Sequence, residues 1–289
     1  MIEINNVSKS YDDKEVLRNI SLNIQQGQIH GIIGENSAGK TTLIKCIAGI
    51  YKPNDGSITL DGRNVFDNPE ANERIAYIAD VPDFMPLYSV SKIVDMNRRF
   101  FDRFDVEKFN SLNELFKIPM KSIAMSMSKG QKMRLNIMIQ MAKNADYILM
   151  DEPSSGLDPL AKKSFFNILV NEVEKNNTGI FISSHNLDGL ERVSDVITMI
   201  NKGVSDNNVV LEDIKNRMSR INAVFPDGVS DDIYKDENIL NITNTGKIYS
   251  MIINDYSENM NSKLKRMGAS FIEKTELTLE EYFIAVVDK

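Results

Sequence analysis

The chain has 289 residues, of which 42% are hydrophobic, and a formal net charge of -7 from 34 basic and 41 acidic side chains. This length is typical of about two domains of ~150 residues each, and the hydrophobic content excludes a disordered chain. The acidic balance disfavours a protein that coats nucleic acid through Lys and Arg, although it leaves room for a local basic patch.

The single cysteine and the lack of long apolar runs indicate a cytosolic protein without a membrane-spanning helix. The single cysteine, Cys46, rules out an internal disulfide and suits a cytosolic protein. It falls on a helical apolar pattern, so we interpret it as a small buried hydrophobe rather than a reactive thiol. No apolar run reaches the ~18 residues that a membrane-spanning helix needs, and the stretch MIEINNVSKSYDD does not resemble a signal peptide. If the protein works at a membrane, another chain must cross it.

Residues 1 to about 80 are predicted to form short strands and hairpins around one helix, with a turn at Pro53–Gly56. Within this region, QIHGIIGENSAGKTTLIKCIAG predicts a strand over Ile29–Ile33, a glycine-rich loop, and a helix that ends at Gly49. The phosphate-loop pattern G-x-x-x-x-G-K-[ST] is met by Gly34, Gly39, Lys40 and Thr41.

This loop predicts a site for nucleotide phosphates. Its backbone N–H groups would surround the phosphates, and Lys40 would supply a cation to the outer ones. The Thr41 hydroxyl would contact Mg²⁺. His30, on the preceding strand, is interpreted as a hydrogen-bonded core residue without a catalytic role.

From Ser89 to about Ala142 the pattern becomes helical. Apolar residues recur at helical spacing at Ile93, Val94, Phe100, Phe101, Phe104, Leu112, Leu115 and Phe116. We interpret RRFFDRF as part of an amphipathic helix that buries its phenylalanines, with docking on a membrane partner as the alternative. The methionines around residues 120 to 150 are expected to fill the core.

The stretch SMSKGQKMR, residues 126–134, predicts a second helix that can bind an anion. Ser128 is a plausible N-cap, and Gly130 lets another group approach the first turn closely. Such a helix directs unpaired backbone N–H groups and the positive end of its dipole toward an anion. A mononucleotide enzyme needs only one phosphate site, so the second one requires an explanation.

Two further segments place acidic or histidine side chains directly after buried strands. In ADYILMDEPSSGLDP, a strand over Tyr147–Met150 delivers Asp151 to hold Mg²⁺ through water and Glu152 to activate the attacking water, an effect of roughly 10²–10⁴ in rate. The alternative, that Asp-Glu-Pro only begins a turn, is weaker beside a phosphate loop. In the later strand, Ile180–Ser183, His185 follows the end and would orient water or contact the γ-phosphate.

After Gly203 the sequence changes character. The segments NAVF, NILNIT, KIYSMII and ASFIEK predict strands, and SENMNSKLKRMG and TLEEYFIAVV predict helices. Together they indicate a small α+β domain without a catalytic or metal-binding constellation, which would pack on the rest of the chain or on a second copy. The charged stretch SKLKRMG is interpreted as a solvated helix face.

The order of these motifs resembles the nucleotide-binding subunits of ABC transporters over residues 1 to about 203. The matching motifs are the adenine-stacking aromatic Tyr11, the Walker A loop Gly34, Glu35, Asn36, Ser37, Ala38, Gly39, Lys40, Thr41 and Thr42, the signature motif Met127–Gln131, the Walker B strand YILMDE, the D-loop Ser155–Asp158 and the switch histidine His185. The resemblance implies that each ATP lies between one chain's Walker A loop and the signature residues Ser128, Lys129, Gly130 and Gln131 of a second chain. One chain then carries two half-sites, which explains the second anion-binding helix.

The resemblance also implies a fold and its cofactors. We expect an α/β P-loop NTPase of the RecA-like type with a mostly parallel core, N-terminal antiparallel strands and an inserted helical subdomain over about residues 85–145. The ATP-binding cassette would cover residues 1–205 and the C-terminal α+β domain residues 206–289. ATP and Mg²⁺ are the implied cofactors.

The sequence departs from the family pattern at two positions. Lys129 replaces the first glycine of the signature, so a long cation lies close to the phosphate and would either aid ATP binding or slow product release. Asp80, in RIAYIAD, stands nearest the position where the family places Gln or Glu. Asp is shorter than Gln or Glu, so its carboxylate would lie farther from Mg²⁺ or its water. The metal contacts that we predict are Thr41, Asp151 and Asp80.

The function expected from the resemblance is that of the ATPase motor of an exporter for peptides or drug-like amphiphiles. Its permease would be a separate chain, it would form a homodimer or a heterodimer with a second ATPase, and it would lie in the cytoplasm against the membrane. The alternative is a soluble ABC ATPase of DNA repair or translation, but the long coiled-coil inserts or paired cassettes of such proteins are absent. A GTPase or small-molecule kinase lacks support, because NKGV at Asn201–Val204 has Val where a guanine-binding motif needs Asp.

Overall fold

The computed structural model describes residues 1–205, 209–229 and 231–287, and the chain divides into two compact units, Met1–Asn208 and Val209–Lys289. The domain boundary predicted between residues 205 and 206 adjoins residues 206–208, which lie outside the described residues. Each unit contains a sheet and a hydrophobic core of its own. No helix in the described part of the chain combines the length and the apolar character that spanning a bilayer requires.

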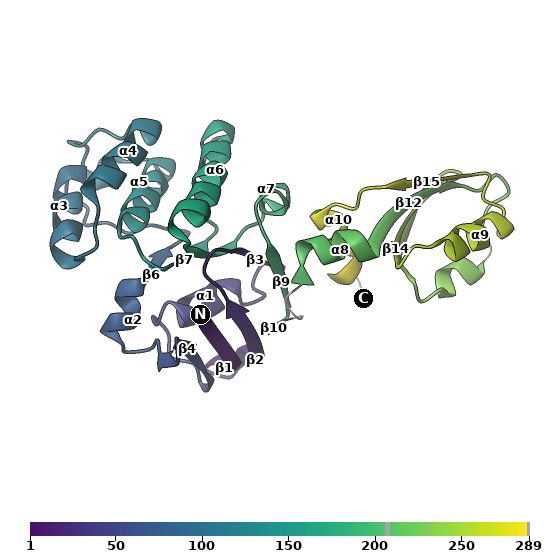
Figure 1. Cartoon of the computed structure of the whole chain (residues 1–289), viewed down its shortest axis with the longest axis horizontal. Coiled ribbons are helices and arrows are strands. Elements are labelled where there is room, and N and C mark those ends of the chain that lie inside the picture. The colour runs from purple at the N-terminus through teal and green to yellow at the C-terminus, as the bar shows by residue number, and fades with distance from the viewer. Residues whose placement is uncertain (206–208, 230, 288–289) are drawn as a thin grey trace. The chain divides into compact units, whose positions relative to one another are not determined.

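A parallel sheet forms the centre of the first unit (Figure 1). Its strands are β3 (Ile29–Ile33), β6 (Ile75–Ile78), β7 (Tyr147–Asp151), β8 (Gly179–Ser183) and β9 (Val196–Asn201), in the order β9-β3-β8-β7-β6. The short strand β10 (Val204–Ser205) pairs antiparallel with β9. Every residue of β3, β7 and β8 is buried, as expected for parallel strands covered on both faces. Because Asp151 pairs in register with Ser183, the carboxyl ends of β7 and β8 lie side by side.

A second, antiparallel sheet packs against this core. Its strands, in the order β2-β1-β4-β5, are β1 (Ile2–Tyr11), β2 (Lys14–Ile24), β4 (Asp55–Leu60) and β5 (Arg63–Asn64). Apolar side chains of this sheet, of α1 (Lys40–Ile47) and of the parallel strands form one core cluster. The turn predicted at Pro53–Gly56 is wrong in its second half, because Asp55 already pairs with Ser8 and belongs to β4.

Helices occupy the segment between β6 and β7. Helix α2 (Pro69–Arg74) precedes β6, and α3 (Val90–Phe100), α4 (Val106–Phe116), the 3-10 turn Ala124–Ser126 and α5 (Lys129–Ala142) follow it. Figure 1 shows α3, α4 and α5 grouped together, which agrees with an inserted helical segment. Helices α6 (Pro159–Asn176) and α7 (Leu187–Glu191) follow β7 and β8.

The phenylalanines of RRFFDRF do not share one buried helix face, so that prediction is wrong. Helix α3 ends at Phe100, whose side chain is 72% exposed, while Phe104 lies beyond the helix and is buried. The chain leaves the helix here because Asp105 caps the next one, accepting a hydrogen bond from the Lys108 N–H at 2.9 Å. Leu115, on α4, is also exposed rather than buried.

The second unit is an antiparallel sheet with helices. After β11 (Val209–Val210) and α8 (Leu211–Arg217), its strands are β12 (Met218–Val224), β13 (Ile239–Thr245), β14 (Ile248–Asn254) and β15 (Phe271–Thr275), in the order β13-β14-β12-β15. A 3-10 turn (Asp231–Lys235), α9 (Glu258–Arg266) and α10 (Leu279–Val287) complete it. All four predicted strands and both predicted helices are present.

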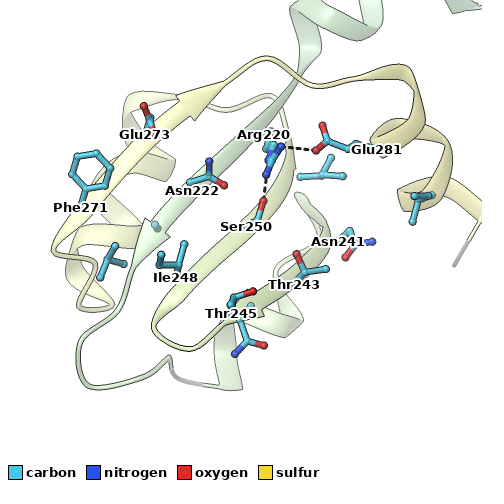
Figure 2. A pocket seen from close by; sticks show the side chains of 15 residues that line it. Arg220, Asn222, Asn241, Thr243, Thr245, Ile248, Ser250, Phe271, Glu273 and Glu281 are labelled. Atoms are coloured by element: carbon cyan, nitrogen blue, oxygen red, sulfur yellow. Dashed lines mark hydrogen bonds and ion pairs between the residues drawn. The ribbon is translucent and has the colours of Figure 1, made fainter. Parts of the chain in front are cut away.

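The two faces of this sheet differ in character. On one face, Ile221, Met251 and Leu264 belong to a buried core. On the other, polar and apolar side chains surround a hollow of about 600 Å³, shown in Figure 2. There the Arg220 guanidinium donates to the Ser250 hydroxyl at 3.1 Å and to the Glu281 carboxylate of α10 at 2.7 Å. This ion pair ties α10 to the sheet.

Candidate active site

A cavity of about 370 Å³ opens where β3 and β7 end and α1 begins. It brings together residues that lie more than a hundred positions apart in the sequence. Its lining consists of Lys14, Val16, Asn36, Ser37, Ala38, Gly39, Lys40, Thr41, Thr42, Asp80, Asp151, Glu152 and His185. The structure therefore gathers most of the predicted phosphate loop, the three predicted metal ligands and both predicted catalytic residues around one space.

The phosphate loop needs its glycines for close packing. Gly39 has a φ of 111°, and a Cβ there would lie 2.7 Å from a Leu17 methyl and 3.0 Å from the Val16 carbonyl oxygen. A Cβ on Gly34 would collide with the Ile200 carbonyl. Gly39 ends the loop directly before α1, and the residues of the first helical turn, Lys40, Thr41 and Thr42, line the cavity. The N–H groups of a first helical turn have no partner within the helix. This arrangement favours an anion.

Lys40 is held in place by the loop itself. Its side chain is buried, and its Nζ donates hydrogen bonds to the carbonyl oxygens of Gly34 at 2.6 Å and Glu35 at 3.0 Å. An ammonium group has three N–H donors, so one is left to point toward a phosphate. Burial lowers the pKa of Lys40, and the nearby carboxylates of Glu152 and Asp151 oppose that shift. The cation is thus preorganised at the wall of the cavity.

Ser183 joins the two acidic residues at the end of β7. Its hydroxyl donates to Asp151 Oδ1 at 2.9 Å and accepts from the Glu152 backbone N–H at 3.0 Å. Asp151 continues the strand, whereas Glu152 has a φ of 48° and so leaves the alternation of the strand. The two neighbouring carboxylates therefore line one cavity from backbones of different conformation, which suits two different roles.

Glu152 and His185 form a close pair. The Glu152 Oε2 accepts a hydrogen bond from the His185 backbone N–H at 3.0 Å, and its Oε1 lies 3.2 Å from His185 Nε2. Burial raises the pKa of Glu152, while His185 and Lys40 act in the opposite direction. A carboxylate with a raised pKa beside a phosphate cavity is a suitable proton acceptor. His30, in contrast, is buried in the core with its Nε2 2.7 Å from the Thr198 hydroxyl, as the sequence predicted.

The oxygen donors around the cavity suit Mg²⁺. Thr41 offers a hydroxyl and Asp151 a carboxylate, both hard oxygen ligands. Among the described residues, no group of three or more His, Cys, Asp or Glu side chains could hold a metal ion by itself. This pattern fits Mg²⁺ sites in which one or two protein oxygens act together with water and substrate phosphates.

None of the signature residues is in the lining of this cavity, although Lys129 Nζ lies 3.7 Å from Asp80 Oδ1, which is in the lining. Ser128 caps α5 as predicted: its hydroxyl accepts from the Gln131 N–H at 3.2 Å, and its own N–H donates to the Gln131 Oε1 at 3.0 Å. At Gly130 an added Cβ would lie 2.8 Å from the Gly156 carbonyl oxygen, so the D-loop approaches this turn closely. The N-terminus of α5 therefore does not line this chain's own cavity.

The N-terminal strands differ from the prediction in which of their residues line the cavity. Tyr11 is not among the lining residues; it is 41% exposed and lies edge-on to Tyr51 with the ring centroids 6.0 Å apart. Lys14 and Val16, from the start of β2, line the cavity but were not predicted. They belong to no short motif, and only the packing of β2 against Gly39 brings them there.

Comparison with known proteins agrees with this geometry. Residues 17–155 match the model of the family described as "ABC transporter". The chain is 30% identical to the ABC transporter ATP-binding protein YtrB of Bacillus subtilis over 99% of this chain and 97% of that protein. It is also 30% identical to the bacitracin transport ATP-binding protein BcrA of Bacillus licheniformis, over 75% of this chain and 72% of that protein.

Solved structures confirm the predicted fold class. An ATP-binding subunit of an ABC transporter, 26% identical, superposes with a TM-score of 0.69 over 75% of this chain and 92% of its own. A bacterial ABC transporter cassette solved as a dimer, 22% identical, has a TM-score of 0.67 over 73% of this chain and 99% of its own. The chain therefore belongs to the ABC transporter family, as one of its ATP-binding ATPase subunits.

Proposed function

We propose that the chain is the motor subunit of a membrane exporter and hydrolyses MgATP in the cavity between α1, β7 and His185. The observation that carries the proposal is the position of Glu152, whose carboxylate shares one cavity with Lys40 and Asp151. Mg²⁺, when bound by Thr41 and Asp151, would neutralise phosphate charge. Lys40 binds the outer phosphates, and Glu152 accepts the proton of the attacking water. Asp80 also lines the cavity, and its contact with Mg²⁺ or its water stays a prediction.

The active form is a head-to-tail dimer with two ATP. The N-terminus of α5 is capped, carries Lys129 with a 55% exposed side chain, and lies outside the chain's own cavity. A second chain placed against it would bring its own phosphate loop to this anion-binding turn. The similar cassette whose structure is dimeric supports the pairing of two chains. The second chain is an identical copy or a related ATPase.

A patch of exposed apolar side chains favours a permease as the partner. Val81, Met85, Leu87 and Met125 are 69%, 61%, 75% and 67% exposed. The Met125 N–H donates to the Pro86 carbonyl at 2.9 Å, so the loop before α3 and the 3-10 turn before α5 form one surface. Contiguous exposed apolar surface marks a contact with another protein. The relatives named for bacitracin transport suggest that the cargo is an amphiphilic peptide or drug.

Copurification tests this assignment. A tagged chain taken from detergent-solubilised membranes should retain a protein with several membrane-spanning helices, and this protein should change the ATPase rate. The double variant Leu87→Ser, Met125→Ser should lose that partner. Tyr234→Ser, which removes a 60% exposed side chain from the second unit, is the matched control and should keep it. Recovery of soluble partners or nucleic acid alone, with an unchanged ATPase rate, would contradict the exporter assignment.

A further inference from the structure

The two positions at which the sequence departs from the family pattern meet in the structure. Lys129 Nζ, from the first turn of α5, lies 3.7 Å from Asp80 Oδ1, in the loop after β6. The same Nζ donates to the Ser155 hydroxyl of the D-loop at 3.3 Å. The ammonium group therefore bridges two loops of its own chain.

The stem of Lys129 also has a defined path. A Cβ added at Gly156 would lie 3.9 Å from Lys129 Cγ and Cδ, so the stem runs beside the D-loop glycine. The side chains of Lys129 and Asp80 are 55% and 42% exposed. An ion pair this exposed changes an equilibrium by at most about fivefold. It can order a side chain and still be broken by a stronger anion.

The side chains of Asp80 and Lys129 each have an alternative contact once nucleotide is bound. Asp80 lines the chain's own ATP cavity, where Mg²⁺ or its water, the contact that we predict for this carboxylate, would compete with Lys129 for it. In the dimer of the proposed function, on which this inference rests, Lys129 faces the phosphates of the partner's ATP. A phosphate carries more negative charge than one carboxylate and therefore competes for the ammonium group.

We propose that Asp80 is a positioning residue for Lys129 and that the pair couples the two ATP sites of the dimer. Without nucleotide, Asp80 holds Lys129 against its own chain. MgATP in that chain's cavity displaces the Asp80 carboxylate from Lys129, and Lys129 is released to the ATP of the partner. The signature residues of a chain thus complete the partner's ATP site only after that chain has bound its own ATP.

The test is a double-mutant cycle on ATP-dependent dimerisation. All variants carry Glu152→Gln, which prevents turnover, and the dimer dissociation constant is measured by analytical ultracentrifugation with MgATP. At sub-saturating MgATP, where many chains still hold Lys129 on Asp80, Asp80→Asn should tighten the dimer, because Lys129 no longer has to leave a carboxylate. With one pair in each of two chains, the expected gain lies between about twofold and 25-fold. In a Lys129→Met background, Asp80→Asn should change the constant by less than about twofold.

Two controls separate this role from a structural one. Asp80→Glu keeps the carboxylate and should behave as the parent, and Asp83→Asn removes an equal charge from an exposed position three residues on and should have no effect. The inference is overturned if Asp80→Asn acts equally in both Lys129 backgrounds, as a lost Mg²⁺ ligand would, or if it acts in neither. If the parent itself stays monomeric with MgATP, the proposed dimer fails and takes this inference with it. A parent that dimerises while the cycle shows no coupling removes the inference alone.

Discussion

The substitution Glu152→Gln isolates the chemical step, because Gln keeps the shape of the side chain and removes only its ability to accept a proton. The amide oxygen can still accept the His185 N–H that now donates to Glu152 Oε2 at 3.0 Å. The hydrogen bonds of Lys40 to Gly34 and Glu35, and of Ser183 to Asp151, do not involve the Glu152 side chain. Phosphate and Mg²⁺ contacts should therefore survive the change.

The expected loss in kcat is about 10²–10⁴-fold, the usual contribution of a positioned general base. This corresponds to about 3–5 kcal/mol of transition-state stabilisation. The affinity for ATP should stay within a few-fold of wild type. Phosphate release under saturating ATP gives kcat, and equilibrium binding of a fluorescent ATP analogue gives the affinity. A variant that kept most of its turnover would remove Glu152 from the role of base, and a large loss of affinity would show that the carboxylate serves binding instead.

Three further predictions concern other parts of the first unit. Tyr11→Ala should weaken ATP binding several-fold and Tyr11→Phe hardly at all, because stacking on adenine is worth about 1 kcal/mol; equal losses in a binding titration would point to the hydroxyl. Burial lowers the pKa of His30 to about 4 from an ordinary 6.5. As the pH drops, the unfolded chain therefore binds a proton at His30 before the folded chain does. The free energy of unfolding should fall by up to about 3 kcal/mol between pH 6.5 and pH 4. Urea unfolding checks this, and a slope unchanged by His30→Gln would refute it. Ser183→Ala should lower kcat at least tenfold with little change in ATP affinity, because it removes the hydroxyl that links Asp151 to the backbone of Glu152; steady-state kinetics with a normal kcat would show that the link is dispensable.

Short motifs with local chemistry were readable from the sequence. The phosphate loop, the acidic end of β7 and the cap of α5 depend on residues within a few positions of one another, so their spacing alone predicts strand, loop and helix. The buried runs of β3, β7 and β8 likewise predict parallel strands without further information.

Features that depend on distant packing were not readable. Phe100 and Phe104 have helical spacing, yet the helix ends between them because Asp105 caps the next helix and the chain must turn to reach it. Lys14 enters the cavity only because β2 packs beside Gly39. The contact between Lys129 and Asp80 joins two loops that no local pattern connects. Periodicity describes one element at a time and carries no information about which elements meet.

The central claim, that each ATP site is built from two chains, is tested most directly by mixing two inactive variants. Lys40→Ala destroys a chain's own phosphate loop. Ser128→Asp keeps an N-cap for α5, since Asp caps as well as Ser, but places a carboxylate where the partner's phosphate must dock. In a mixed dimer both changes fall in the same site, and the other site is wild type.

Equal amounts of the two chains put about half of all dimers in the mixed form, each with one good site of two. The mixture should therefore recover about a quarter of the wild-type rate of phosphate release, although each variant alone is inactive. A mixture as inactive as its components, together with a wild-type specific activity that does not depend on protein concentration, would contradict the account and place the whole site within one chain.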